Sequence, residues 1–405
     1  MNKQRVRLAT AGIVALALIG AACGSDDDSS SEPSDTSATS EAPADSTADS
    51  TAGGEPAADC ETPEPVSLQL QWFTQAQFAG YFAAKDKGFY EDMCLDVTIV
   101  EGGVEIVPQT QLANGDVDFA LAWVPKALAS REAGADITNI AQIYQRSGTL
   151  QVSFADAGIT TPEDFAGKKI GNWGFGNEYE VFAAIGEAGL DPATDVELVG
   201  QQFDMVALLD GSIDAAEAMT YNEYAQVLET VNPDTGELYT PEDFNVISYE
   251  DIGVGMLQDA IWADAGRLAD DPAYQDQATR FVAASIEGWV YCRDNVEECR
   301  DIVVAAGSTL GSSHQLWQMN EVNKLIWPSP DGIGYINQAS WDRTVEISQN
   351  TPNLDGATVL TAPPTDGAYT NDIVEAAWAM LADQGLDLFG PDYAAIDVTL
   401  NEGGE

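Results

Sequence analysis

Apolar and polar residues follow two alternating periods from residue 66 onward. A strand period is seen in the runs "SLQLQW", "LDVTIV" and "VDFALAW". A helical period is seen between them, in "QFAGYFAAKDKGFY" and in "IVPQTQLANGD". A strand–helix–strand–helix–strand order predicts a parallel sheet with right-handed crossovers, since that is how parallel strands are connected.

A second series of the same kind begins after residue 155. It opens with a Pro-Glu-Asp helix start in "TPEDFAGKKIGNWG", whose "KKIGNW" is predicted as a strand. The series continues through "VELVGQ", "DMVALLDGSIDAAEAM" and "FNVISY". Beyond Tyr249, "EDIGVGMLQDAIWA" is predicted to return as a strand to the first series, followed by mostly helical sequence.

These two series predict an α/β protein with two parallel-sheet lobes. We expect residues 66–155 to form the first part of lobe 1, residues 156–252 to form lobe 2, and residues 253–405 to contain the return to lobe 1 and the C-terminal helices. The lobes would be joined by two crossovers, near 150–158 and 249–257, with a cleft between them.

The N-terminus has the pattern of an export signal, predicted over residues 1–22. Lys3, Arg5 and Arg7 precede an apolar run and the small residues "GAAC". Cys23 then resembles the lipid-accepting cysteine of a bacterial lipobox, although Gly20 stands where leucine is usual. A lipid on Cys23 would anchor the protein to the outer face of the plasma membrane. The alternative is a secreted protein whose cysteine carries no lipid.

Residues 23–65 are predicted to form a disordered acidic stalk. From Gly24 to Pro65 the chain contains no lysine, arginine or large aromatic residue and cannot bury enough apolar surface to fold. The whole chain has a formal net charge of −51. Such a charge repels nucleic acid and anionic headgroups, so we expect no nucleic-acid partner and no membrane contact except through the lipid.

Four cysteines remain after Cys23, and they can pair in three ways. Export permits disulfides. Cys292 and Cys299 flank a polar turn in "CRDNVEEC", so we predict that they pair and that Cys60 pairs with Cys94. A metal site is the rival interpretation of the cysteines. Because the chain has one histidine, His314, and no Cys-x-x-Cys, we predict no metal and no cofactor.

The stretch "LQWFTQAQFAGYFAAKDKGFYEDMCLDVTI" resembles the opening of ABC-transporter solute-binding proteins that carry the pyrimidine precursor of thiamine. That family combines a strand, a tryptophan-containing break and the pattern AGYxxAxxKGFYxxxGLDV. The matching residues are Gly80, Tyr81, Ala84, Lys87, Gly88, Phe89 and Tyr90. Cys94 stands where the family usually has glycine, and "LANGDVDFALA" is similar to a later family motif. The resemblance covers roughly residues 66–340.

This resemblance implies a type II periplasmic-binding-protein-like fold on the extracytoplasmic face of the cell membrane. It also implies a monomer whose partners are a small heterocyclic ligand, an ABC permease and its ATPase. Relatives in the family bind sulfonates, taurine, nitrate or riboflavin. The family's eukaryotic branch includes thiamine pyrimidine synthase, which uses iron, pyridoxal phosphate and a cysteine-rich motif. Because this chain lacks such a motif, we expect a binding protein and not an enzyme.

Aromatic residues stand at the predicted carboxyl ends of three strands, where open α/β sheets bind their ligands. They are Trp72, Phe73, Trp123 and Trp173. Such rings can sandwich a flat heterocycle, whereas a sulfonate or nitrate favours hydroxyl groups, arginine or helix-end amides. Core packing is the alternative role for each ring. The ligand is therefore predicted to be the thiamine pyrimidine precursor, with the larger riboflavin as the alternative.

Polar residues near the same strand ends complete the predicted ligand site. Gln77, Gln145 and Ser147 are candidates for hydrogen bonds to ring nitrogens, and Glu217 and Glu223 are candidate acceptors for an exocyclic amine. The remaining candidates are Tyr81, Gly174, Asn177 and Tyr221. The default expectation for Glu223 is an exposed helical residue, with ligand binding as the alternative. "GNWGFGNE" lacks the Lys-Ser/Thr of a phosphate loop, so we expect a tight turn that admits ligand to the second lobe.

Overall fold

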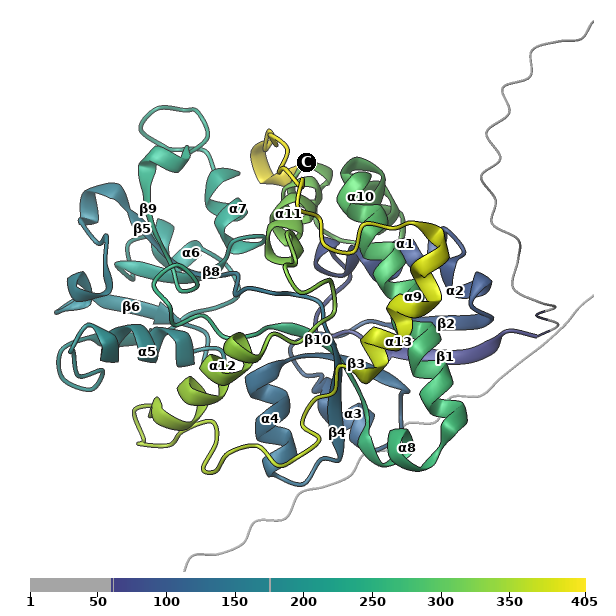
Figure 1. Cartoon of the computed structure of the whole chain (residues 1–405). Helices are drawn as coiled ribbons and strands as arrows, with labels where there is room; N and C mark the ends of the chain where they lie inside the picture. The colour runs from purple at the N-terminus through teal and green to yellow at the C-terminus, as the bar shows by residue number, and fades with distance from the viewer. Residues whose placement is uncertain (1–59, 61, 175) are drawn as a thin grey trace, which may run out of the picture. The chain divides into compact units, whose positions relative to one another are not determined.

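The protein contains two five-stranded sheets (Figure 1). The structure, a computed structural model, describes residues 60, 62–174 and 176–405. The first sheet has the order β2-β1-β3-β10-β4 and consists of β1 (Glu64–Gln69), β2 (Leu95–Val100), β3 (Phe119–Trp123), β4 (Ile137–Gln142) and β10 (Asp259–Asp264). The second has the order β7-β6-β8-β5-β9 and consists of β5 (Thr149–Phe154), β6 (Lys169–Asn172), β7 (Glu197–Gly200), β8 (Ala215–Met219) and β9 (Phe244–Ser248). We call the first sheet with its helices the first lobe, and the second sheet with its helices the second lobe.

The predicted signal segment, Cys23 and nearly all of the predicted stalk lie outside the described residues. The stalk was predicted to extend to Pro65, but β1 already begins at Glu64. Glu64 and Pro65 pair in register with Leu95 and Asp96 of β2. The last two residues of the predicted stalk are therefore part of the first sheet.

Each sheet is predominantly parallel, as predicted, but contains one reversed strand. β10 runs antiparallel to β3 and β4, and β5 runs antiparallel to β8 and β9. The other pairs, β1 with β2 and β3, and β6 with β7 and β8, are parallel. β5 and β10 are the strands that the chain forms immediately after it passes from one sheet to the other. Hydrophobic period identifies a strand but not its direction, so this reversal is absent from the sequence pattern.

Two connections join the sheets, at residues 143–148 and 249–258. The first was predicted near 150–158, but residues 149–154 already pair within the second sheet as β5. The second lies where it was predicted. The side chain of Gln258 ties the two connections together, because it accepts a hydrogen bond from the Gly148 amide at 2.9 Å and donates to Thr149 Oγ1 at 2.7 Å.

Helices pack around both sheets (Figure 1). The first lobe contains α1 (Ala79–Asp86), α2 (Phe89–Asp92), α3 (Pro108–Ala113), α4 (Val124–Glu132), α8 (Ala265–Asp270), α9 (Pro272–Asp294), α10 (Val296–Ala305) and α13 (Asp372–Leu381). The second contains α5 (Tyr179–Glu187), α6 (Val206–Leu209) and α7 (Glu223–Leu228). The helix predicted over "QFAGYFAAKDKGFY" is divided between α1 and α2, because Gly88 adopts a left-handed φ of 81°. Within the described part of the chain, no helix combines the length and apolar character needed to cross a bilayer.

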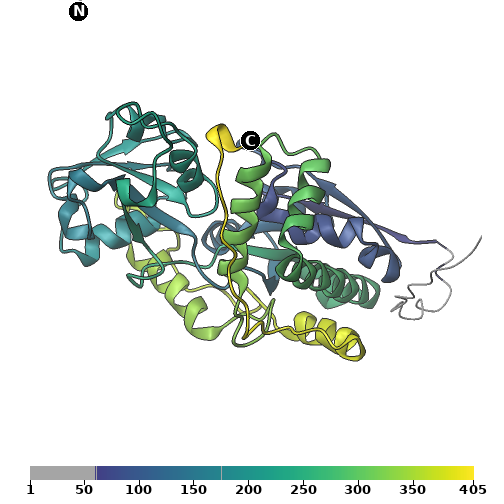
Figure 2. The ribbon, with the colours of Figure 1, turned by 90° about the horizontal axis from the view of Figure 1, so that it is seen from above.

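The C-terminal region contacts both lobes. α12 (Gln338–Asn350) packs against α4 and α5, and α11 (Ser312–Ile326) packs against α10 and α7. In α11, Trp317 Nε1 donates to the carbonyl oxygen of Thr220, which follows β8, at 2.9 Å. The final segment, yellow in Figure 2, reaches the second lobe, where the Gly403 amide donates to the Glu229 carbonyl oxygen at 3.0 Å. These contacts would resist any rotation of one lobe against the other.

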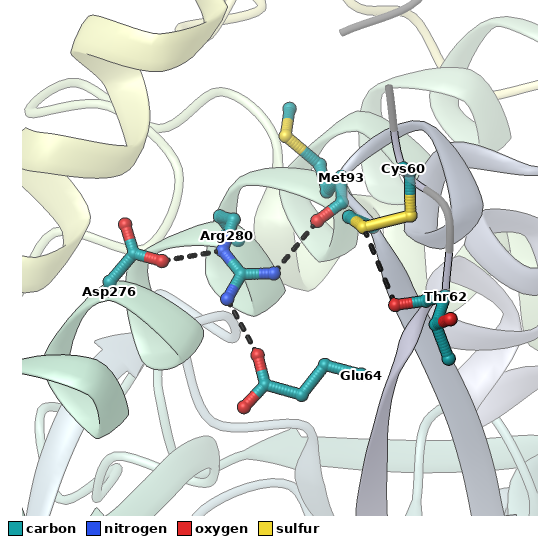
Figure 3. The surroundings of a disulfide bond; sticks show 7 residues. Cys60, Thr62, Glu64, Met93, Asp276 and Arg280 are labelled. Atoms are coloured by element: carbon teal, nitrogen blue, oxygen red, sulfur yellow. Dashed lines mark hydrogen bonds and ion pairs between the residues drawn. A yellow bond between two sulfur atoms is a disulfide. The ribbon is translucent and has the colours of Figure 1, made fainter. Parts of the chain in front are cut away.

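Both predicted disulfides are present. Cys60 pairs with Cys94 and Cys292 pairs with Cys299, with Cα–Cα distances of 5.7 Å and 5.5 Å. The first bridge links the residues before β1 to the start of β2 (Figure 3). Beside it, Arg280 donates to Glu64 Oε2 at 2.7 Å and to the Met93 carbonyl oxygen at 3.0 Å. The bridge is therefore embedded in a polar network that also includes α9.

Cys94 has a φ of 59°, and no other non-glycine residue of the described chain has a positive φ. This left-handed conformation is unfavourable for a residue with a Cβ atom and readily adopted by glycine. It explains physically why the resembling family usually has glycine at this position. In this chain the same position carries a disulfide instead.

Candidate functional site

A cavity of about 770 Å³ lies between the two lobes. Residues that end or follow five strands line it: Trp72 after β1, Trp123 at the end of β3, Trp173 after β6, Phe203 after β7 and Tyr221 after β8. Residues 103–109 form part of its remaining wall. The carboxyl ends of strands from both sheets thus converge on one cavity, as expected for a ligand site in open α/β sheets.

Three aromatic rings form a continuous series across this cavity. The Trp72 and Phe203 rings have centroids 4.9 Å apart at an interplanar angle of 60°. Phe203 in turn stacks on Trp173, with centroids 5.8 Å apart and an angle of 24°. Trp173 is held by two hydrogen bonds, from its amide to Glu217 Oε2 at 2.8 Å and from Nε1 to the Gln202 carbonyl oxygen at 3.2 Å. The cavity therefore has an aromatic wall to which both lobes contribute.

A buried carboxylate lies behind the first-lobe wall. Asp259 accepts hydrogen bonds from Gln71 Nε2 at 2.7 Å and from Gln77 Nε2 at 3.1 Å. It also accepts one from Trp123 Nε1 at 2.9 Å. Burial raises the pKa of Asp259 to about 6, partly offset by these donors. All three donors belong to residues that line the cavity.

One cationic side chain, Lys126, is found among the residues that line the cavity. It stands near the start of α4, and its Nζ lies 4.9 Å from the centroid of the Trp123 ring, a cation–π contact. Burial lowers the pKa of Lys126 to about 8, although nearby carboxylates oppose the shift. Lys126 therefore offers a cationic N–H donor to the cavity.

Glu223 lines the cavity and is buried, which corrects the prediction of an exposed residue. Its Oε2 accepts from the Met219 amide at 2.9 Å and its Oε1 accepts from Asn222 Nδ2 at 2.7 Å. Burial raises its pKa. Asn222 also contacts His314 of α11, whose Nε2 lies 3.0 Å from Asn222 Oδ1. The helical position of Glu223 was predicted correctly, but α11 covers the face that the sequence suggested would be exposed.

Half of the predicted ligand residues line the cavity: Trp72, Gln77, Trp123, Trp173, Asn177 and Tyr221. Phe73 lies at the rim instead, where it is 47% exposed and contacts Trp72 at 5.3 Å between centroids. Tyr81 is buried in the first-lobe core against Trp289, with centroids 5.6 Å apart. The Tyr81 side chain lies on the face of α1 that packs against α9, and this face is turned away from the cavity.

Four further predicted residues support the structure around the cavity. Gln145 donates to the Gln142 carbonyl oxygen at 2.6 Å. Ser147 lies in the first connection, where its amide donates to Glu250 Oε2 at 3.0 Å. The Gly174 carbonyl oxygen accepts from Asn177 Nδ2 at 2.9 Å. Glu217 is fully buried behind Trp173, and burial raises its pKa well above the ordinary value. These side chains position the connections and the wall residues.

Sequence reasoning missed several residues of the cavity wall. Phe203 follows β7 in the run "QQFD", and the strand-end rule that selected Trp72 applies to it equally. Lys126 is one helical turn beyond Trp123 and could have been found in the same way. Asp259, which lies behind the wall, had no such signal, because it begins its strand instead of ending it.

Two mixed sheets, two connections and a cavity between the lobes define the class of two-lobed periplasmic-binding-protein folds. The periplasmic sulfonate-binding protein SsuA from Methylobacillus flagellatus KT has this fold, with a TM-score of 0.56 and 15% identity over 84% of this chain and 99% of that chain. The chain belongs to the NMT1/THI5-like family, whose family model matches residues 75–299.

Two curated relatives are similar in sequence. The formylaminopyrimidine-binding protein of Halalkalibacterium halodurans is 22% identical over 249 residues, covering 61% of this chain and 72% of the relative. The riboflavin-binding protein RibY of Chloroflexus aurantiacus is 23% identical over 334 residues, covering 77% of this chain and 87% of the relative.

Proposed function

We propose that this protein is the extracytoplasmic solute-binding component of an ABC importer and that its ligand is a flat aromatic heterocycle. The observation that carries the proposal is the series Trp72, Phe203 and Trp173, which extends across the cavity from one lobe to the other. Aromatic rings bind flat π-systems through dispersion and apolar burial, and a site shared by two lobes couples binding to their closure.

The first candidate ligand is the pyrimidine precursor of thiamine. It is supported by the similarity to the formylaminopyrimidine-binding protein and by the amide side chains of Gln71, Gln75 and Gln77 on the cavity wall. A substituted pyrimidine has both a π-face for the aromatic rings and ring-edge groups for the amides. The residues proposed to bind it are the six predicted residues that line the cavity, together with Lys126 and Phe203.

Riboflavin is the second candidate, and the size of the cavity favours it. A volume of about 770 Å³ lies in the range of sites that enclose drug-sized ligands, and a single pyrimidine ring would fill only a small part of it. The similarity to RibY also extends over more of this chain than the similarity to the formylaminopyrimidine-binding protein. Both ligands would use the same aromatic series.

The proposal includes a lipid anchor on Cys23, delivery of the ligand to an ABC permease with its ATPase, and action as a monomer without catalysis. The anchor is supported by the basic, apolar and small-residue order of the N-terminus. Replacing Cys23 by serine should release the protein from membranes into the medium. Equal membrane retention of the Cys23→Ser variant would contradict the anchor and leave the ligand proposal untouched.

The ligand is tested by mass spectrometry of small molecules released on denaturing freshly purified protein. Calorimetric titration with the thiamine pyrimidine and with riboflavin follows. We expect one of these heterocycles to be released, and the same one to bind saturably to protein that was stripped and refolded. Release of a sulfonate or another non-aromatic solute, together with no binding of either heterocycle, would overturn the proposed function.

A further inference from the structure

The reversed strand β10 brings an acid to the binding edge of the first sheet. Asp259 is the first residue of β10 and pairs in register with Trp123, the last residue of β3. Because β10 is antiparallel to β3, its starting residue lies at the edge where β1 and β3 end. Asp259 is 2% exposed, so its carboxylate is directed at the wall residues and not at bulk solvent.

An ionised carboxylate only accepts hydrogen bonds, and this fixes the orientation of the amides around it. Gln71 and Gln77 must turn their Nε2 groups toward Asp259, at 2.7 Å and 3.1 Å. Gln77 Oε1 then accepts from Gln75 Nε2 at 2.7 Å. The carboxylate thus orients two amides directly and a third through Gln77.

One N–H direction of each of these amides is consequently committed within the protein. Gln71 Oε1 and Gln75 Oε1 accept no hydrogen bond from residues 60, 62–174 or 176–405, and both glutamines line the cavity. Gln71 and Gln75 therefore offer carbonyl oxygens, which are acceptors, to a ligand group that lies against them, whereas the donor of this wall is Lys126 on α4. A ligand group that is itself an acceptor could not form a hydrogen bond with these oxygens, because neither partner has a donor.

We infer that Asp259 is a positioning residue that makes the part of the first-lobe wall formed by Gln71 and Gln75 selective for ligand groups with N–H donors, such as the exocyclic amine of an aminopyrimidine. This inference rests on the proposed function and specifies which edge chemistry the heterocycle carries. A buried carboxylate is unfavourable to folding, and removing its charge while keeping its shape isolates the orienting role.

Asp259→Asn is the variant that tests the inference. Asparagine keeps the volume but adds an N–H donor, which permits Gln71 or Gln77 to rotate and present Nε2 to the cavity. Asp118→Asn is the matched control, because Asp118 precedes β3 in the same sheet, bonds to Ser67 and is not among the cavity-lining residues. Gln71→Met is a second test variant, since it removes the acceptor without altering the buried charge.

The probes are 4-amino-5-hydroxymethyl-2-methylpyrimidine and its 4-oxo analogue, with riboflavin and N3-methylriboflavin as a second pair that differs in one N–H. Calorimetry gives the affinity ratio of each pair. For the pair that binds, we expect Asp259→Asn and Gln71→Met to reduce the preference for the N–H ligand about tenfold or more. Asp118→Asn should leave the ratio unchanged.

Equal weakening of both members of the pair would mean that Asp259 acts only on stability and would overturn the inference, while the proposed function stands. An unchanged ratio in Gln71→Met would overturn it also, even if Asp259→Asn fails to fold. If the wild-type protein binds neither pair, the inference and the proposed function both fail.

Discussion

Trp72 of the first lobe contacts Phe203 of the second, with ring centroids 4.9 Å apart. The two residues are 131 positions apart in the chain (203 − 72), and each follows a strand of a different sheet. This contact makes the aromatic series a link between the lobes as well as a wall of the cavity. Binding and lobe arrangement should consequently respond to changes in the same rings.

Trp72→Ala should weaken ligand affinity about ten- to a hundredfold, since a stacked ring contributes roughly 1–3 kcal/mol to binding a base-like ligand. The fold should persist because Trp72 is only partly buried. Trp289→Ala is the control: Trp289 is fully buried in the first-lobe core, and its loss should destabilise the protein by about 3–5 kcal/mol. Calorimetry and thermal melting compare them. Lost stability with unchanged affinity in Trp72→Ala would assign that ring to packing alone.

Phe203→Ala removes the aromatic contact across the cavity, so that the C-terminal contacts alone oppose rotation of the lobes, and it should expand the protein in the absence of ligand. Rotation would occur about residues 143–148 and 249–258, and ligand should restore the compact form by bridging the lobes. Small-angle scattering measures the radius of gyration in both conditions. Phe73→Ala is the control, because Phe73 contacts Trp72 within the first lobe only. A Phe203→Ala profile identical to wild type would show that the contact does not hold the lobes together.

Glu180 should make stability depend on pH. Its Oε1 accepts from the Met256 amide at 2.6 Å, and burial raises its pKa to about 7 from an ordinary value of 4.5. Between these values the folded protein retains a proton that the unfolded chain releases, so stability falls as pH rises through this window. The full contribution is present below about pH 4.5 and lost above about pH 7.

Glu180→Gln keeps the acceptor and removes the charge. As pH rises through the window between the two pKa values, Glu180→Gln should become increasingly more stable than the wild type. The gain is at most about 1.4 kcal/mol for each unit by which the pKa of the folded carboxyl exceeds that of the unfolded one. Chemical denaturation at several pH values measures this difference. A difference that stays constant from below this window to above it would mean that the Glu180 carboxyl does not titrate there.

Substitutions at Cys94 should separate the effect of backbone strain on stability from the effect of the disulfide crosslink. In a Cys60→Ser background, Cys94→Gly should be more stable than Cys94→Ala by about 1 kcal/mol, since only glycine readily adopts the left-handed φ of 59°. Both should be less stable than the oxidised wild type, because closing a loop with a sequence separation of 34 contributes about 4 kcal/mol. Equal melting temperatures for the glycine and alanine variants would rule out a contribution from strain.

Much of the fold could be predicted because buried strands carry their own signal. "LDVTIV" corresponds to β2, and the return after Tyr249 corresponds to β10. The reversal of β5 and β10 could not be predicted, since these strands have the same hydrophobic character in either orientation. The unknown strand reversal also limited the prediction of the cavity residues. Trp72, Trp123 and Trp173 end or follow strands and were identified, whereas Asp259 starts a reversed strand and was not.

The polar residues were predicted less well because their roles depend on partners distant in the chain. Ser147 and Gln145 have the chemistry of ligand-binding residues, but the Ser147 hydroxyl accepts from Gln258 Nε2 and the Gln145 amide donates to the Tyr335 carbonyl oxygen, 111 and 190 residues away. Sequence spacing gives no information about such partners. Aromatic residues at strand ends are less ambiguous, since their position in the sheet already determines which edge they occupy.

The Cys60–Cys94 bridge determines which strands would bear a mechanical force applied to the N-terminal segment. Tension on the chain before Cys60 would pass through the sulfur atoms to the start of β2 as well as along the backbone to β1. β1 and β2 are parallel and hydrogen-bonded over their full length, so the force would shear both strands together instead of peeling β1 away. Trp72 lies three residues beyond the end of β1. Tension applied at Cys60 would thus be resisted by the paired strands of the first sheet before it reached Trp72 and the cavity.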